Sequence, residues 1–372
     1  MRVGVPKEIK NREYRVGLTP ASVQELVGHG HELVVEDNAG FEIGFTNELY
    51  RQAGAVILDT SAEIFATADM IVKVKEPQPS EIARLREGQI LYTYLHLAPD
   101  PIQTRGLLES GCIAIAYETV TDSRGGLPLL APMSEVAGRM SIQAGAHALE
   151  MAQGGRGMLL GGVPGIAPAK VTIIGGGVVG TNAAQMAVGL DAEVTILDKS
   201  ARRLRELDMH FAGRVKTLYS TQSALEEALP FSDLTIGAVL VPGAAAPKLV
   251  SEAMVEKMLR GSVLVDVAID QGGCFATSKA TTHENPTYLV HDVVHYCVAN
   301  MPGGVARSST LALNNSTLPF AIRIANDGLQ AALNNDAHLM NGLNIYQGQL
   351  TYQAVAKDQN LEYFPAPEAL AA

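Results

Sequence analysis

The sequence contains few cysteines, no long apolar run and no signal peptide. Its cysteines, Cys112, Cys274 and Cys297, are odd in number and lack the paired spacing of a metal site, which predicts buried, reduced thiols. No window offers the roughly 18 consecutive apolar residues of a membrane span. The first residues, MRVGVPKEIKN, lack the apolar core of a signal peptide. These absences predict a cytoplasmic protein without a membrane partner.

Charge and length narrow the class further. The net charge is −11 and no basic block occurs, which argues against nucleic-acid binding because such proteins carry a positive surface. Hydrophobic residues make up 47% of the chain and charged residues 18%, which is typical of a globular protein. A length of 372 residues favours two domains of about 150–200 residues each.

The first third of the chain alternates short β-rich runs with helical stretches. This alternation predicts βαβ units that form a mostly parallel sheet. Between the first two runs, Thr19 is a candidate helix N-cap, Pro20 a first helical residue, and Gly28 or Gly30 a helix end. The predicted strands are RVGVP, ELVVE, AVIL, MIVKV, ILYTYL and CIAIAY.

A second βαβ series begins at Val171, with strand candidates VTIIG, EVTILD, DLTIGA, SVLVDVA and TYLV. Residues 132–153 have apolar residues at helical spacing and predict a helix that crosses between domains, followed by a glycine-rich loop. After Gly304 the pattern is helical and offers no third sheet, so these helices are expected to pack on the first domain. The predicted fold is α/β, with two doubly wound domains. A discontinuous domain, residues 1–130 and 305–372, would contain residues 131–304 as an insertion.

The stretch VTIIGGGVVGTNAA has the pattern of a dinucleotide-binding turn. Gly175, Gly177 and Gly180 fit G-x-G-x-x-G between a strand and a helix, and Asp198 ends the next strand. The first glycine permits the tight turn, the second lets the backbone approach a pyrophosphate, and the third lets helix and strand pack closely.

The carboxylate of Asp198 favours NAD over NADP. It lies 18 residues after Gly180, where it would bind ribose hydroxyls and repel a 2′-phosphate. The alternative stays open, because a cluster of basic residues follows and would hold a phosphate if the carboxylate turned away. These residues are Lys199, Arg202, Arg203 and Arg205.

Three charged or titratable residues follow strands of the first domain. Arg15, Lys75 and His96 come after predicted strands that would end at one edge of the sheet, where ligands of doubly wound sheets bind. Arg15, in bidentate fashion, and Lys75 suit a substrate carboxylate, and His96 suits proton transfer. For each residue alone, surface charge or a hydrogen-bonded histidine would be the simpler interpretation, so the hypothesis depends on their convergence.

Asp270 is the matching candidate in the second domain. It follows the strand SVLVDVA and would place an acid or base near a nicotinamide ring. The alternative is an ordinary turn, because Asp followed by Gly-Gly is common turn chemistry. In HDVVH, His291, Asp292 and His295 suggest a metal site, but a third ligand is missing, so hydrogen-bonded turn residues are the prediction.

Several longer motifs carry a resemblance that covers essentially the whole chain. They are VPKEIKNREYRVGLTP, DNAGFEIGF, KVKEP, YLHLAPD, GGGVVG and HYCVANMPG. Together they resemble the bacterial L-alanine dehydrogenases. That family interconverts L-alanine with pyruvate and ammonia using NAD, pairs a split substrate domain with a Rossmann domain, and is usually hexameric, so the resemblance implies the same here.

The resemblance also implies site residues. Arg15 and Lys75 match the substrate carboxylate and carbonyl binders, His96 the acid/base and Asp270 the second catalytic group. Around the cofactor it implies Ser134, Asp198, Arg203, Ser220, Asn300 and Met301. Alanine would bind in a cleft between the domains. The sequence leaves open which of His96 and Asp270 activates water, and whether glycine, serine or glyoxylate are minor substrates.

Two other functions remain as alternatives. The family is related to the NAD-binding subunit of proton-translocating transhydrogenases, which passes hydride to a partner protein. That subunit needs membrane partners, and this chain has no span of its own. A regulatory NAD-binding protein without turnover is the other alternative.

Overall fold

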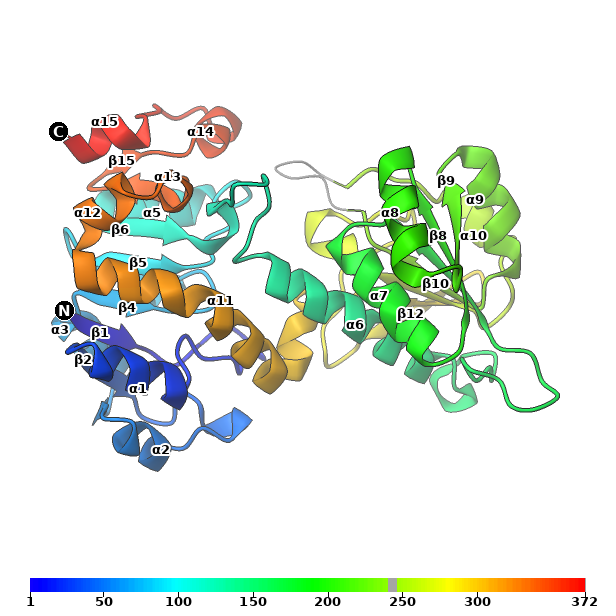
Figure 1. The fold of residues 1–372 in the computed structure, drawn as a ribbon, viewed down its shortest axis with the longest axis horizontal. Helices are drawn as coiled ribbons and strands as arrows, with labels where there is room; N and C mark the ends of the chain where they lie inside the picture. The colour runs from blue at the N-terminus through cyan, green and yellow to red at the C-terminus, as the bar shows by residue number, and fades with distance from the viewer. Residues whose placement is uncertain (240–245, 372) are drawn as a thin grey trace. The chain divides into compact units, whose positions relative to one another are not determined.

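The computed structural model describes residues 1–239 and 246–371. The chain divides into two compact units (Figure 1). Unit 1 comprises Met1–Met133 and the residues from Val305 onward, and unit 2 comprises Ser134–Gly304. The sequence placed these ends at residues 130 and 304. The predicted fold class, an α/β domain inserted in a discontinuous α/β domain, is confirmed, whereas the roles assigned to the two segments stay predictions.

Unit 1 contains an eight-stranded sheet in the order β15-β14-β6-β5-β4-β1-β2-β3. Strands β1 to β6 are parallel, and β14 and β15 extend the sheet in antiparallel fashion beside β6. The six predicted strands are present. The strands are β1 (Arg2–Val5), β2 (Glu32–Glu36), β3 (Val56–Leu58), β4 (Met70–Val72), β5 (Ile90–Thr93), β6 (Ile113–Ala116), β14 (Leu343–Tyr346) and β15 (Gln349–Leu350).

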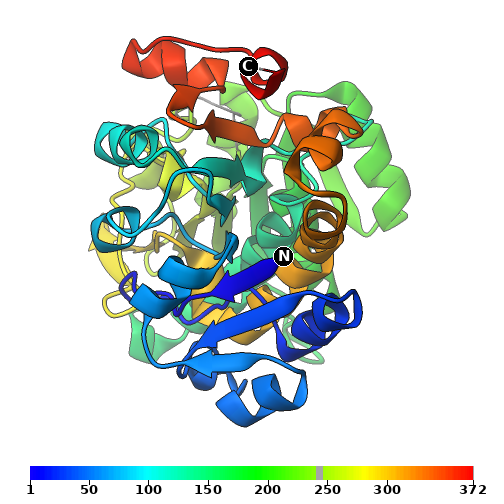
Figure 2. The same ribbon diagram turned by 90° about the vertical axis from the view of Figure 1, so that its left-hand side faces the viewer.

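Helices cover both faces of this sheet, with α1 and α11 on one face and α4 and α5 on the other (Figure 2). Thr19 caps α1 as predicted, since its hydroxyl accepts the N–H of Ser22 at 3.1 Å. The long helix α11 packs on α1, which confirms the predicted return of the C-terminal helices. The helices are α1 (Pro20–Gly28), α2 (Asn47–Gln52), α3 (Ser61–Thr67), α4 (Pro79–Ile82), α5 (Pro101–Ser110), α11 (Ala306–Asp327), α12 (Leu329–Asn334), α13 (Ala337–Met340), α14 (Gln353–Gln359) and α15 (Ala366–Ala371), with η1 (Phe41–Ile43) and η2 (Tyr117–Thr119) as 3₁₀ turns.

Unit 2 contains a seven-stranded sheet in the order β12-β13-β11-β10-β7-β8-β9. All neighbours are parallel except β12, which pairs antiparallel with β13. The predicted series lacked β9 and β13. The strands are β7 (Lys170–Ile174), β8 (Glu193–Asp198), β9 (Val215–Tyr219), β10 (Leu234–Gly237), β11 (Val263–Asp266), β12 (Thr287–Val290) and β13 (Val293–Tyr296).

The predicted crossing helix is shorter than expected. Helix α6 ends at Ala148 rather than near 153, and a 3₁₀ turn follows. Gly154 is left-handed, with φ of 87°, and a Cβ on Gly155 would lie 2.3 Å from the carbonyl oxygen of Ala148. The chain therefore folds back on the end of α6. The helices of unit 2 are α6 (Ala131–Ala148), α7 (Val178–Gly189), α8 (Ala201–Phe211), α9 (Gln222–Ala228) and α10 (Glu252–Val255), with η3 (Met151–Gln153), η4 (Leu229–Phe231), η5 (Val267–Gln271) and η6 (Met301–Val305).

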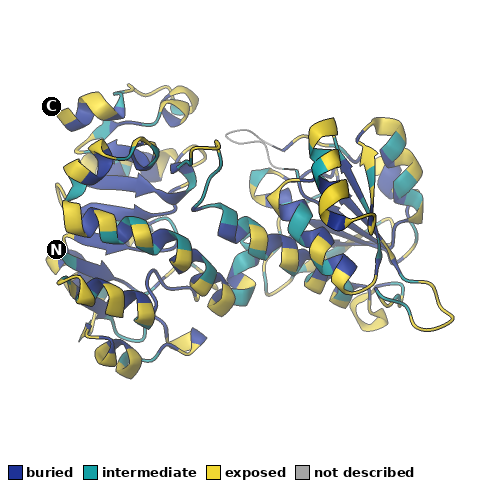
Figure 3. Ribbon diagram, viewed as in Figure 1, coloured by how far each residue is buried: buried dark blue, intermediate teal, exposed yellow. Residues whose placement is uncertain are grey.

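Each unit has its own core, with buried strands and helices whose outer faces are exposed (Figure 3). Leaving the antiparallel strands aside, both sheets have the order 3-2-1-4-5-6 of a doubly wound fold. The order reverses between β1 and β4 in unit 1 and between β7 and β10 in unit 2. In such folds ligands bind beyond the carboxyl ends of the strands at these two places. All three cysteines are buried free thiols, as predicted. None of the described helices has the length and apolarity needed to cross a membrane.

Candidate active site

The loop that carries Arg15 passes directly over the end of β4. Gly17 makes this possible, because a Cβ there would lie 2.2 Å from the carbonyl oxygen of Val72. Asn314 of α11 holds the loop from the other side. Its side chain accepts the N–H of Thr19 at 2.9 Å and donates to the carbonyl of Gly17 at 3.1 Å. A residue nearly 300 positions away in the sequence thus fixes this loop.

The guanidinium of Arg15 is buried, with 2% of the residue exposed, and is paired with Glu13. Its Nε and Nη2 donate to the two carboxylate oxygens of Glu13 at 2.7 and 2.6 Å, and Nη1 lies 3.2 Å from Sδ of Met133. Surface charge is therefore the wrong interpretation of Arg15. Because Glu13 occupies the Nε edge in bidentate fashion, a substrate carboxylate would have to use other N–H groups.

Lys75 lies in a bend just beyond β4. Its carbonyl accepts the hydroxyl of Thr93, the last residue of β5, at 2.9 Å. The next residue, Glu76, pairs with Lys10. Burial raises the pKa of Glu76, but the charges of Lys75 and Lys10 outweigh it and hold that pKa below its usual value. Lys75 thus lies beside Glu76 and Lys10, at the carboxyl edge of the sheet of unit 1.

His96 has an unusual backbone conformation, with φ of 50°. Two contacts hold it. Its N–H donates to Glu118 at 2.6 Å, and its ring stacks on Tyr94 with 5.7 Å between ring centroids. The ring nitrogen Nδ1 lies 3.8 Å from Glu118, which would pair with the protonated ring. Because 47% of the side chain is exposed, the imidazole remains accessible for proton transfer.

Tyr94 and the residue before it connect the three predicted residues of unit 1. Its hydroxyl donates to the carbonyl of Leu129 at 2.5 Å, and its ring stacks on His96. Burial raises the pKa of Tyr94, while the nearby charge of Arg15 lowers it. The residue before it, Thr93, binds Lys75. Arg15 and His96 therefore lie near Tyr94, and the backbone of Lys75 contacts the residue before it, beyond the carboxyl ends of β4 and β5.

The glycine loop of unit 2 leaves space where a dinucleotide would need it. Gly175 has φ of 103°, and a Cβ on Gly180 would lie 1.8 Å from the carbonyl oxygen of Gly175, so both positions demand glycine. Gly177 is different, because a Cβ there would meet none of the described residues within 4 Å. It is the N-cap of α7 and makes no side-chain cap. Open space in front of a helix N-terminus fits a pyrophosphate.

Asp198 and Arg203 both hold this loop. Asp198 accepts the N–H of Gly176 at 2.8 Å and the N–H of Ser200 at 2.7 Å. Arg203 donates to the carbonyl of Gly176 at 2.7 Å and to the hydroxyl of Thr181 at 2.8 Å. Arg203 is thus engaged with the loop itself, and the carboxylate of Asp198 is fixed at the end of β8.

The remaining predicted cofactor residues occupy different places in unit 2. Ser220 is buried beyond β9, and its N–H donates to the carbonyl of Asp198 at 3.0 Å. Ser134 is half-buried on α6. Asn300 has φ of 61° and its carbonyl lies 3.0 Å from Nε2 of His283, whereas Met301 is 3% exposed and packs in the core of unit 2. Ser220 therefore lies beside Asp198.

Asp270 is exposed on the 3₁₀ turn η5, which follows β11. A buried neighbour, Asp266, fixes this turn. Its carboxylate accepts the N–H groups of Ala268 at 3.1 Å and Cys274 at 2.9 Å, and the hydroxyl of Ser278 at 2.5 Å. Asp266 therefore binds residues on both sides of the turn that carries Asp270.

The histidines of HDVVH have other partners. His291 and Asp292, with φ of 51° and 59°, form the turn between β12 and β13, and His291 bonds Glu252 at 3.0 Å. The prediction of a turn is wrong for His295, which belongs to β13. It is buried, and its Nε2 lies 2.7 Å from the hydroxyl of Thr277. Among the described residues no group of three or more potential ligands occurs.

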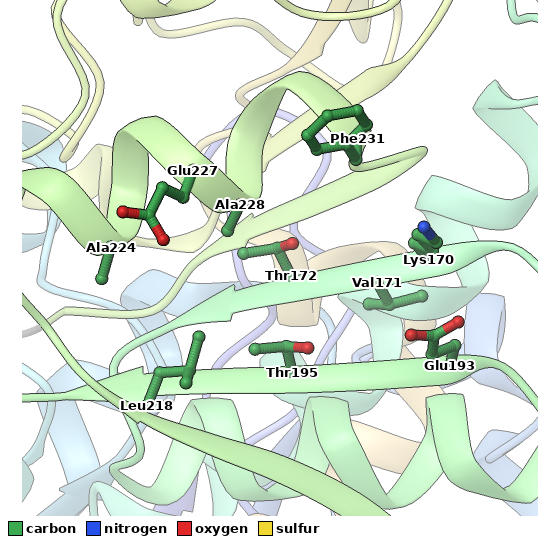
Figure 4. A pocket seen from close by; sticks show the side chains of 10 residues that line it. All are labelled: Lys170, Val171, Thr172, Glu193, Thr195, Leu218, Ala224, Glu227, Ala228 and Phe231. Carbon is green, nitrogen blue, oxygen red and sulfur yellow. The ribbon is translucent and has the colours of Figure 1, made fainter.

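A pocket of about 310 Å³ lies elsewhere on unit 2 (Figure 4). It is formed by the first residues of β7 and β8 together with β9, α9 and η4. Lys170 and Glu193 mark the amino ends of their strands, opposite the ends that carry the glycine loop and Asp198. None of the predicted site residues lines this pocket.

Sequence reasoning missed the residues that hold the site residues in place. These are Glu13, Tyr94, Glu118, Asp266 and Asn314. Glu13 and Tyr94 lie within the motifs NREYR and YLHLAPD, so their neighbours gave a signal. Asn314 gave none, because its partners are far away in the sequence.

Comparison with known proteins agrees with the motifs. The family models described as "Alanine dehydrogenase/PNT, N-terminal domain" and "Alanine dehydrogenase/PNT, C-terminal domain" match residues 4–137 and 141–353. An alanine dehydrogenase from Halomonas elongata is 62% identical over 366 residues, which cover 98% of this chain and 99% of that protein.

Solved structures agree with this result at two levels of sequence identity. An L-alanine dehydrogenase matches with a TM-score of 0.94 and 52% identity, covering 97% of this chain and 99% of that one. A transhydrogenase from Sinorhizobium meliloti matches with a TM-score of 0.81 and 24% identity, covering 95% of this chain and 100% of that one, which shows a shared fold alone. The predicted resemblance is confirmed, and the chain belongs to the Alanine dehydrogenase/PNT family.

Proposed function

We propose that this protein catalyses the NAD-dependent interconversion of L-alanine with pyruvate and ammonia. The observation that carries the proposal is the 62% identity, over nearly the full length of both chains, with a protein named alanine dehydrogenase. The likeness to a transhydrogenase is much weaker, at 24% identity. A cytoplasmic location and a hexameric assembly stay predictions.

The substrate would bind to the polar residues of unit 1. Arg15 and Lys75 would hold the carboxylate and carbonyl oxygens, with the guanidinium oriented by Glu13. Because two positive charges at the end of a doubly wound sheet attract a small anion, this arrangement suits pyruvate and the carboxylate of alanine. Holding the reacting groups in line contributes up to about 7–11 kcal/mol toward lowering the barrier.

Bound NAD would supply the acceptor for the hydride that leaves the substrate. The residues that would hold it fit a dinucleotide: the glycine loop offers open space at Gly177, and Asp198 is fixed where ribose hydroxyls would reach it. We expect the unmodified protein to prefer NAD over NADP on the order of a hundredfold, because the carboxylate of Asp198 repels a 2′-phosphate. Asp198→Ala should reduce this preference, mainly by weakening the binding of NAD. Equal use of both cofactors by the unmodified protein would contradict this part of the proposal.

Residues of this chain would transfer the protons to and from the substrate. Alanine reacts with its amino group uncharged, so that the nitrogen lone pair forms an iminium ion as the Cα–H bond breaks with loss of hydride. Water adds to its carbon, and His96 or Asp270 takes the proton of that water. The same groups return a proton to the nitrogen and take the proton of the new hydroxyl group as the C–N bond breaks, so that ammonia and pyruvate leave. Reductive amination follows the same steps in reverse.

One assay separates the three candidate functions. Purified protein with alanine and NAD, followed by absorbance of the reduced nicotinamide, should turn over rapidly if it is a dehydrogenase. A hydride-relay subunit would need a partner protein, and a regulatory protein would bind NAD without turnover. Absence of turnover with saturating alanine and NAD would therefore sink the proposal. Glycine and serine in the same assay would define the minor substrates.

A further inference from the structure

A buried cluster of three charged residues lies next to Lys75 without a part in the chemistry above. Lys73 is fully buried, and its Nζ lies 3.1 Å from Oε2 of Glu8 and 2.6 Å from Oε1 of Glu81. Glu8 is 6% exposed and Glu81 is 1% exposed. Glu8 and Lys73 belong to the motifs VPKEIKN and KVKEP. These two motifs therefore meet in the folded unit.

A gain in folding stability does not account for this cluster. Burying charges costs free energy through desolvation, and well-packed apolar residues often stabilise a protein as much or more. The polar atoms here are nevertheless satisfied. Oε2 of Glu81 accepts the N–H of Gln78 at 2.8 Å and so closes the first turn of α4. The oxygen Oε1 of Glu8 has a different pair of partners.

The carboxylate of Glu8 binds two consecutive backbone N–H groups, those of Val74 and Lys75. Oε1 accepts the N–H of Val74 at 2.7 Å and the N–H of Lys75 at 3.2 Å. Strands β1 and β4 pair only as far as Gly4 and Ile71, so beyond that point β1 provides no ladder partner. Glu8, which follows β1, supplies with its side chain the acceptor that the strand no longer offers.

The end of β5 and the residue after it hold the same segment from its other edge. The N–H of Tyr94 donates to the carbonyl of Val74 at 3.3 Å, and the hydroxyl of Thr93 donates to the carbonyl of Lys75 at 2.9 Å. Thr93 is fully buried. Both peptide groups of Lys75 are thus fixed by side chains, the N–H by Glu8 and the carbonyl by Thr93.

We propose that Glu8 and Thr93 are positioning residues that fix the backbone of Lys75 and so aim its ammonium group at the substrate. The inference rests on the proposed substrate-binding role of Lys75. A lysine is a point charge on a flexible stem of four carbons, so its reach is defined only if its Cα is held firmly. A site whose supporting residues are loose binds its substrate poorly even when every binding group is present.

Lys73 offsets part of the effect of burial on Glu8, whose pKa lies above its usual value. Burial raises the pKa of Glu8, Lys73 lowers it, and the second carboxylate, Glu81, raises it again. Tyr117 holds Lys73 in register, since its hydroxyl donates to the carbonyl of Lys73 at 3.0 Å. An ionised carboxylate forms shorter and stronger bonds to N–H groups than a neutral acceptor does.

The test compares Glu8→Gln with the matched control Glu81→Gln. Each variant removes one carboxylate from the same buried lysine. Only Glu8→Gln weakens the bonds to the backbone of Lys75, and Glu81→Gln even removes a charge that opposes the ionisation of Glu8. We expect KM for pyruvate to rise about tenfold in Glu8→Gln, equivalent to about 1.4 kcal/mol, and by less than about twofold in Glu81→Gln. KM for NADH should stay unchanged in both.

A double-mutant cycle with Lys75→Gln separates this inference from the proposed function. If Glu8 acts through Lys75, adding Glu8→Gln to Lys75→Gln should raise KM for pyruvate little further. Additive effects, or an equal rise in Glu81→Gln, would overturn the positioning role. If Lys75→Gln alone leaves KM for pyruvate unchanged, the substrate-binding role of Lys75 fails instead.

Thr93→Val provides an independent variant in case Glu8→Gln does not fold. It keeps the shape of the side chain and removes only the hydroxyl that binds the carbonyl of Lys75. We expect KM for pyruvate to rise several-fold, with the same lack of additivity in the Lys75→Gln background. A normal KM in a folded Thr93→Val protein would show that the carbonyl of Lys75 needs no such support and would overturn this half of the inference.

Discussion

His96 combines a strained backbone with an accessible ring. A non-glycine residue at φ of 50° costs on the order of 1–3 kcal/mol, and such strain persists only where neighbours hold it. Here Glu118 binds the N–H of His96 and Tyr94 supports its ring. Glu118 and Tyr94 thus fix the imidazole at the edge of the sheet, where it is accessible for proton transfer.

We therefore expect His96→Ala to lose most of its kcat while NAD still binds, because the predicted cofactor residues belong to unit 2. The loss of one positioned acid/base group costs about 10²–10⁴ in rate. Steady-state kinetics and fluorescence titration with NADH give the two values. A fall in cofactor affinity as steep as the fall in kcat would identify His96 as a structural residue.

Asp270 is either a catalytic residue or an ordinary turn residue, because it is exposed on a turn. Asp270→Asn keeps size and turn preference but removes the charge and the ability to take a proton. If Asp270 takes part in catalysis, kcat should fall at least on the order of a hundredfold while NAD affinity and melting temperature stay close to the parent. Asp292→Asn, the same change on another exposed turn, is the control. A near-normal kcat would leave His96 as the remaining acid/base candidate.

Among the elements, helix α11 holds the loop that carries Arg15. The side chain of Asn314, 2% exposed, accepts from Thr19 and from the hydroxyl of Ser22 and donates to Gly17. We expect Asn314→Ala to leave buried backbone groups unsatisfied, each at a cost of about 1–3 kcal/mol, and to raise KM for pyruvate. Thermal unfolding and steady-state kinetics measure the two effects.

Asn315→Ala is the matched control, because the adjacent asparagine is exposed on the same helix. It should change stability by less than about 0.5 kcal/mol. Similar losses in the two variants would mean that α11 contributes only helical packing and that the loop does not depend on Asn314.

The elements also show what the sequence could and could not predict. The parallel strands with continuous apolar runs, such as MIV and VTII, were found because burial on both faces leaves a plain pattern. Strand β9 was missed because it is an edge strand with mostly exposed side chains. Strands β14 and β15 have only four and two residues, and their place beside β6 depends on pairing across more than 200 residues.

The same distinction applies to the candidate site. Arg15, Lys75 and His96 could be proposed from their positions after strands, because the carboxyl ends of parallel strands meet at one edge. The hydrogen bonds that Arg15 donates to Glu13 could not be predicted, since an acidic residue two positions away is equally common on a surface. Which residues hold the functional groups depends on side-chain geometry, which periodicity does not encode.

For the whole molecule, the predicted hexamer needs a different justification. Helix α11, which follows Gly304, buries residues such as Leu313 and Ile324 within unit 1, so these side chains do not form a contact with another subunit. The proposal then depends on the family resemblance alone. We expect light scattering at micromolar concentration to give about six times the monomer mass of 39.4 kDa. A monomer mass would refute it.

The discontinuity of unit 1 also has a consequence for synthesis on the ribosome. The segment that carries Arg15 is made early, but the asparagine that holds it, Asn314, emerges about 300 residues later. The edge of β6 likewise stays unpaired until β14 has been made. Unit 2 is made of one continuous segment and can therefore complete its folding before the last segments of unit 1 have been synthesised. The nascent chain would gain the ability to bind a dinucleotide before it gains the ability to bind its substrate.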